Sequence, residues 1–156
     1  MMIAHDKPDL ILITEVIPKN QINPITSASL HIEGYTPCFN FNPDDDNLGA
    51  VGYRGVAIYF KNHLEAIEVE IDGFLDHAWI ELPTKGGPLL VGCVYRSPSD
   101  DTNMEQSMNS SKKVANVIKT ACQRNKNVII NKNVIIYSTT KKLIGLMNTL
   151  IRTKST

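Results

Sequence analysis

The final third of the sequence lacks acidic side chains. All 16 Asp and Glu residues lie within residues 1–105, together with six basic residues, whereas residues 106–156 contain ten basic residues and no acidic one. The formal net charge of zero therefore conceals two segments of opposite charge. Such an asymmetry can mark a region that faces nucleic acid, and lysines on the solvated face of a helix would produce the same pattern. Both interpretations stay open for the basic segment.

Cysteine is scarce, with only Cys38, Cys93 and Cys122. Their spacing fits no zinc-binding pattern, and an odd number cannot form a closed set of disulfides. A basic leader followed by a long apolar stretch is also missing, because the first apolar run, residues 10–13, is short and is followed by Thr14-Glu15. We expect neither a signal peptide nor a transmembrane helix. These absences predict an intracellular protein with reduced thiols, in the cytoplasm or the nucleus, without a membrane partner.

The chain nevertheless has the composition of a folded domain, since 42% of its residues are hydrophobic and 21% are charged. Apolar runs and period-two alternation predict strands at residues 10–13, 30–42, 55–60, 66–71, 78–82 and 89–95. The last four follow one another and suggest an antiparallel meander. Helical spacing of apolar residues predicts helices over 102–124 and 139–151, with two short strands between them. This order indicates an α/β (α+β) layered domain with a mixed sheet and flanking helices.

Three of these segments resemble a known family. Residues 8–15 read Pro-Asp-Leu-Ile-Leu-Ile-Thr-Glu, residues 55–61 read Gly-Val-Ala-Ile-Tyr-Phe-Lys, and residues 90–98 read Leu-Val-Gly-Cys-Val-Tyr-Arg-Ser-Pro. In this order and at these separations they resemble the endonuclease domains of non-LTR (LINE/jockey-like) retrotransposons, which belong to the endonuclease/exonuclease/phosphatase superfamily. Gly34-Tyr35 and the strand around Trp79 fit the same pattern. The resemblance implies a β-sandwich of two mixed sheets with outer helices, of which this chain carries the N-terminal half.

The resemblance also implies roles for three residues in metal-dependent hydrolysis of DNA. Glu15 corresponds to the catalytic carboxylate that helps to hold the divalent metal, Mg²⁺ or Mn²⁺, and hard cations prefer oxygen ligands. Tyr95 corresponds to a catalytic tyrosine beside the scissile phosphate, where a phenol can donate a hydrogen bond to a phosphate oxygen. Arg96 corresponds to a nucleic-acid-binding residue on the DNA backbone. From composition alone, each would be an ordinary strand-end or surface residue.

The sequence departs from the family pattern in three places. No Asn lies upstream of Ile13, where the family has one on an earlier strand. After residues 127–130 the family has Gly-Asp-Phe-Asn, which orients the attacking water, whereas here Asn131-Lys132 follows and no Asp occurs after Asp101. The closing Ser-Asp-His of the family, a general base or phosphate ligand, does not occur in the 156 residues. We therefore expect a truncated domain with negligible nuclease activity, because such groups act as a unit.

Asp76-His77 offers a pair of the right residue types, but it lies well before Tyr95 in the sequence and is expected to be out of place. A tandem repeat follows the helix, since residues 125–130 and 131–136 both read Asn-Lys-Asn-Val-Ile-Ile. It could be a hairpin with Asn131-Lys132 as its turn. It could equally be a scar of replication slippage or of a wrongly joined exon. We favour the scar, because the family has Gly-Asp-Phe-Asn at this point.

These observations divide the chain into residues 1–130, a partial endonuclease/exonuclease/phosphatase domain, and residues 131–156, a divergent basic tail with a helix. Half a sandwich is expected to expose an apolar inner sheet face, unless the residues from Asn131 on cover part of it. An uncovered face would make the chain marginally stable, prone to aggregation or dimeric through that face. The leading interpretation is an inactive fragment of a DNA endonuclease. Another branch of the superfamily, such as an abasic-site endonuclease or a phosphoinositide phosphatase, is one alternative. A non-catalytic nucleic-acid-binding module or structural remnant is the other.

Overall fold

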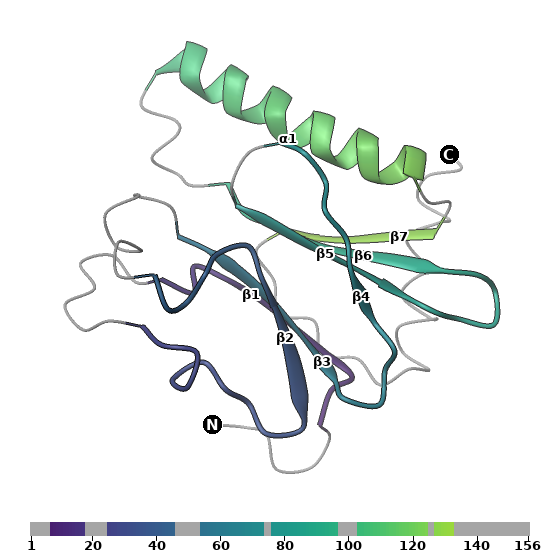
Figure 1. The fold of residues 1–156 in the computed structure, drawn as a ribbon. Coiled ribbons are helices and arrows are strands. Elements are labelled where there is room, and N and C mark those ends of the chain that lie inside the picture. The colour runs from purple at the N-terminus through teal and green to yellow at the C-terminus, as the bar shows by residue number, and fades with distance from the viewer. Residues whose placement is uncertain are drawn as a thin grey trace.

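A computed structural model describes residues 7–17, 25–45, 54–73, 76–96, 103–124 and 127–132 (Figure 1). The predicted helix at 139–151 and the second of the two short strands predicted before it lie outside these residues. The described part forms two sheets and one helix. Figure 1 shows the helix above one sheet and the other sheet on the far side, so three layers are stacked. The layered α+β architecture predicted from the sequence is confirmed.

The first sheet contains β1 (Leu10–Thr14), β2 (Tyr35–Phe39) and β3 (Val56–Lys61), in the order β1-β3-β2 with antiparallel pairing throughout. β3 is central, and its first five residues are buried on both faces. A run of β-branched and aromatic side chains suits such a strand, because each face of the pleated backbone meets apolar neighbours.

The second sheet contains β4 (Ile67–Glu68), β5 (His77–Leu82), β6 (Leu89–Val94) and β7 (Asn127–Lys132), in that order. The first three strands are antiparallel neighbours, whereas β7 runs parallel to β6. A parallel neighbour requires a long connection, which the intervening helix provides.

The predicted four-strand meander is therefore wrong at its first member. β3 pairs with β1 and β2 in the first sheet, and only β4, β5 and β6 follow one another as antiparallel neighbours. Adjacency in sequence favoured a hairpin between β3 and β4. The burial of the two strands explains why they do not pair. A strand with two apolar faces belongs in the middle of a covered sheet, whereas Ile67 and Glu68 of β4 are both exposed.

Apolar side chains from both sheets fill the space between them. Leu12 and Ile58 of the first sheet and Ile80 and Val91 of the second are each exposed by 2% or less and belong to one cluster. Within the described residues the two inner faces thus cover each other, and the expected open inner face is wrong. Among these residues, β1, β2, β4 and β7 are the edge strands, each with one edge that has no neighbouring strand. Self-association itself stays a prediction.

Helix α1 (Met104–Arg124) covers the outer face of the second sheet (Figure 1). Its buried side is formed by Val114, Val117 and Ala121, which pack against Trp79 and Val94. This spacing of three and four residues places them on one stripe of the helix. Within the part of the chain that the structure describes, no helical stretch combines the length and the apolar character that a membrane span requires.

β7 corrects the hairpin interpretation of the repeat. The strand continues through Asn131 and Lys132, which pair with Cys93 and Val94 of β6, so these two residues do not form a turn. A scar of duplication stays a prediction, and so does the division of the chain after residue 130.

Candidate functional site

Four strand ends meet at one end of the two sheets. The end of β1 lies beside the start of β3, since Thr14 pairs with Val56. The end of β6 lies beside the start of β5, since Val94 pairs with His77. Polar residues that continue these strands are therefore brought together, although they lie far apart in sequence.

Glu15 comes directly after β1 and has a positive φ of 56°. It is the one non-glycine residue with positive φ in the described ranges. This conformation costs a residue with a side chain about 1–2 kcal/mol, and it turns the carboxylate out of the alternation of β1. The main chain is fixed on the next two residues, because Val16 N donates to Gly55 O at 3.2 Å and Ile17 N donates to Arg54 O at 2.8 Å. The backbone around Glu15 is therefore held in place, and this fixes the direction in which the carboxylate leaves the main chain.

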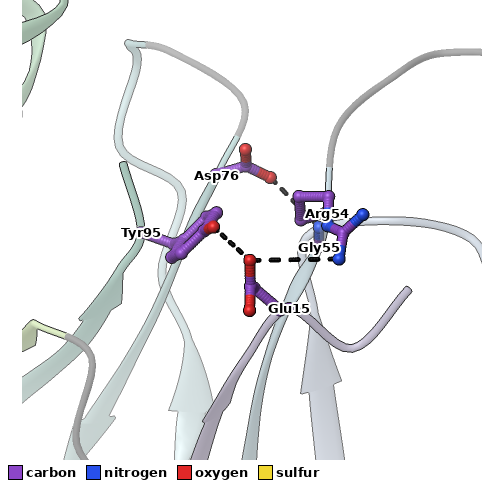
Figure 2. A network of polar contacts seen from close by, with 5 residues as sticks. All are labelled: Glu15, Arg54, Gly55, Asp76 and Tyr95. Carbon is purple, nitrogen blue, oxygen red and sulfur yellow. Dashed lines mark hydrogen bonds and ion pairs between the residues drawn. The ribbon is translucent and has the colours of Figure 1, made fainter. Parts of the chain in front are cut away.

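Tyr95 follows β6, and its hydroxyl donates a hydrogen bond to Glu15 Oε1 (Figure 2). The bond joins residues 80 positions apart and connects the two sheets at their shared end. Nearby, the Cys93 thiol donates to Ile13 O at 3.8 Å, a second connection between the sheets. The two catalytic residues implied by the family resemblance are thus placed in direct contact, while their roles stay predictions.

Burial raises the pKa of Tyr95 to about 12, and the hydrogen bond and negative charge of Glu15 act in the same direction. Arg54 lowers this pKa and Asp76 raises it, both by their charges. A phenol with this pKa keeps its proton throughout the neutral range. Tyr95 is therefore a hydrogen-bond donor at this site.

Arg54 lies two residues before β3, and no sequence pattern singled it out. Its Nη2 lies 3.9 Å from Glu15 Oε1, and its side chain is only 16% exposed, against 48% for Glu15. Gly55 follows with a φ of 69°, and a Cβ atom there would lie 2.8 Å from the ring of Phe41. Glycine therefore lets the chain pass close to Phe41 as it enters β3.

Asp76 is also part of this region, which corrects the expectation that the Asp76-His77 pair is out of place. Its Oδ1 accepts a hydrogen bond from Gly55 N at 3.2 Å (Figure 2). Its main-chain oxygen accepts one from Tyr95 N at 2.9 Å. Antiparallel pairing brings the start of β5 to the end of β6, so distance along the sequence was misleading. His77 makes a different contact from that of Asp76: its Nδ1 accepts a hydrogen bond from Trp79 Nε1 at 3.0 Å.

Arg96 turns toward the helix layer. Its Nη2 donates to Ser107 Oγ of α1 at 2.8 Å, and the residue is half-buried. The guanidinium thus fastens the end of β6 to the first turns of α1. Contact of Arg96 with nucleic acid stays a prediction.

The described residues do not fit a self-sufficient divalent metal site. Among them, no three His, Cys, Asp or Glu side chains gather as ligands. Glu15 supplies one carboxylate, whose Oε1 is already shared between the hydroxyl of Tyr95 and the guanidinium of Arg54. A hard divalent cation needs six or so oxygen ligands, and a neighbouring positive charge opposes its binding.

The described chain is thus a layered α+β sandwich with a polar cluster at one end of its two sheets. No family model matches the sequence, and no curated protein matches it. Among solved structures it is similar to the catalytic domain of human Nocturnin with bound sulfate anion, at 14% sequence identity and a TM-score of 0.46. The alignment covers 81% of this chain and 51% of that one, so the chain spans about half the length of the Nocturnin domain.

Proposed function

We propose that the chain carries part of the DNA-cleaving site of an endonuclease/exonuclease/phosphatase domain of the retrotransposon kind, and that it does not hydrolyse DNA by itself. The observation that supports this most is the hydrogen bond from Tyr95 to Glu15. The family resemblance gives these two residues adjacent roles, one at the metal and one at the phosphate. Their contact across two sheets is what such roles require.

The chemistry available to these residues is limited. Tyr95 has a single hydroxyl proton, which it donates to Glu15 in this structure; to stabilise charge on a phosphate oxygen, the hydroxyl would have to exchange Glu15 for that oxygen as its acceptor. In the family, Mg²⁺ or Mn²⁺ polarises the phosphate and activates water when bound. The groups that orient the water are replaced here, because β7 continues into Asn131-Lys132 where the family has Gly-Asp-Phe-Asn. Glu15 and Tyr95 alone therefore position no nucleophile.

A plasmid-nicking assay tests the proposal. The purified chain, incubated with supercoiled DNA and Mg²⁺ or Mn²⁺, is expected to convert no more plasmid than its Glu15→Gln variant, because neither form assembles the complete catalytic set. Nicking by the unaltered chain that Glu15→Gln abolishes would contradict the proposed inactivity.

A second candidate, a non-catalytic nucleic-acid-binding module, is favoured by one feature of α1. The helix carries four exposed basic side chains, Lys112, Lys113, Lys119 and Arg124. Its one acidic residue is Glu105, in the first turn. Exposed cations on one helix match the spaced negative charges of a nucleic-acid backbone.

The same plasmid distinguishes this candidate, because binding without cleavage gives retarded but intact DNA. Retention should weaken as salt rises, and a Lys112→Gln, Lys113→Gln, Lys119→Gln variant should lower the slope of log affinity against log salt by about 1 for each lysine in contact. An identical slope in the variant would show that these lysines are only a solvated face.

A further inference from the structure

Arg54 is held against Glu15 by the main chain on both sides of the contact. Its carbonyl oxygen accepts from Ile17 N at 2.8 Å, and the carbonyl of the next residue accepts from Val16 N at 3.2 Å. These bonds prolong the pairing of β1 with β3 beyond Thr14 and Val56. The main chain at position 54 is therefore fixed beside the residues that follow Glu15, and its side chain reaches the carboxylate from there.

The guanidinium of Arg54 is poorly solvated for a charged group. Its side chain is 16% exposed, and its Nε is buried with no hydrogen-bond partner among the residues that the structure describes. Burying a cation is costly unless an opposite charge compensates for it. Glu15 is the carboxylate at ion-pair distance, with Oε1 3.9 Å from Nη2. The positions of the two charges are therefore coupled.

The Glu15 carboxylate receives both a hydrogen bond and a compensating positive charge from other residues of the same chain. Oε1 accepts the Tyr95 hydroxyl on one side and faces the Arg54 cation on the other (Figure 2). A metal-ligand carboxylate would instead offer its oxygen to an ion of charge two. Arg54 brings a fixed positive charge to within a few ångströms of where that ion would bind, and like charges at such distances repel.

We infer that Arg54 is a built-in counter-ion for Glu15, which neutralises the carboxylate from within the chain and keeps divalent cations away from it. Arg54 has this role only if Glu15 is the inherited metal-ligand position, so the role rests on the proposed function. Arg54 is then a positioning residue that holds the carboxylate toward Tyr95 in place of a metal. Within the described residues, this charge and the shortage of ligand side chains both act against a metal at Glu15.

Direct measurement of Mn²⁺ binding to the full chain tests this role without any activity assay. The electron paramagnetic resonance signal of free Mn²⁺ is followed as the ion is added to the unaltered chain, to Arg54→Met and to Arg54→Gln. Both variants should bind one Mn²⁺ about tenfold more tightly than the unaltered chain, since a repulsive charge is gone. Arg54→Lys keeps the charge and should bind as weakly as the unaltered chain.

Two controls separate this role from a structural one. Adding Glu15→Gln to Arg54→Met should abolish the gain in affinity, and far-ultraviolet circular dichroism should show that each variant keeps the native fold. Arg54→Gln serves if Arg54→Met does not fold. Equal Mn²⁺ affinity in the unaltered chain and the folded neutral variants would overturn the inference, as would a gain that survives Glu15→Gln. DNA nicking is read separately, so a failure of this inference and a failure of the proposed function give different results.

Discussion

Gly92→Ala should prevent the domain from folding stably. Gly92 lies in β6 opposite Trp79 of β5, and the indole ring packs flat over it. A Cβ atom at position 92 would lie 2.1 Å from Cζ3 and 2.3 Å from Cε3 of Trp79. The ring is 1% exposed and is packed between the second sheet and α1, so it has no room to move. We expect a loss of about 3 kcal/mol or more in the free energy of unfolding, measured by urea denaturation.

Two matched variants decide whether the clash is the cause. Gly86→Ala lies in the turn before β6, where an added Cβ meets nothing closer than Thr84 Oγ1 at 4.0 Å, so stability should change by less than about 0.5 kcal/mol. In a Trp79→Leu background, which removes the indole, adding Gly92→Ala should cost less than about 1 kcal/mol further. A full penalty in that background would refute the packing explanation.

Cys38 and Cys93 should be almost inert toward thiol reagents in the folded protein. Burial raises the pKa of each thiol to about 12 from an ordinary value of 9.0, and Glu68 adds to the effect at Cys38. Since the thiolate is the reactive form, each should react about 1000-fold more slowly than in the unfolded chain at pH 8. Titration with a disulfide reagent should label one thiol of three, Cys122 on α1, and all three after urea is added.

The same pKa shifts predict how stability depends on pH. The folded pKa values exceed the unfolded ones, so the contribution is fully present below pH 9 and is lost as pH rises from 9 toward 12. Replacing both residues by Ala should flatten this decline.

A Cys122→Ser variant supplies the labelling control, because it should show no rapidly labelled thiol. Rapid labelling of either remaining thiol in the folded Cys122→Ser chain would contradict the burial of Cys38 and Cys93.

The sequence predicted the strands of this fold better than their partners. The apolar runs at residues 10–13, 55–60 and 89–95 each became a buried strand within one residue of the expected bounds. The pairing of the strands could not be predicted in the same way. It depends on which strand faces are covered, and the residues that cover them lie far away in the sequence. β3 thus joined β1 and β2, not the strand that follows it.

The residues of the site also divide into those that the sequence identified and those whose place depends on strand pairing. Glu15 and Tyr95 were identified through their family resemblance, since each stands at the end of a recognisable strand. Arg54 was missed, because an Arg before a strand carries no signal of its own, whereas Asp76 was considered and set aside because it lies well before Tyr95 in the sequence. One clue was available for Asp76: two strands joined by a short turn place the start of one beside the end of the other. No comparable rule places Arg54 beside Glu15, because that contact requires the pairing of β1 with β3.

The contact between Glu15 and Tyr95 is the center of this account, and a double-mutant cycle on stability tests it most directly. Glu15→Met removes the acceptor and Tyr95→Phe removes the donor, with little change in size. Because Glu15 is half exposed, the expected coupling is about 1 kcal/mol in the free energy of unfolding, with the double variant less unstable than the sum of the single ones. Strictly additive effects, within about 0.3 kcal/mol, would mean that the two strand ends do not form one site.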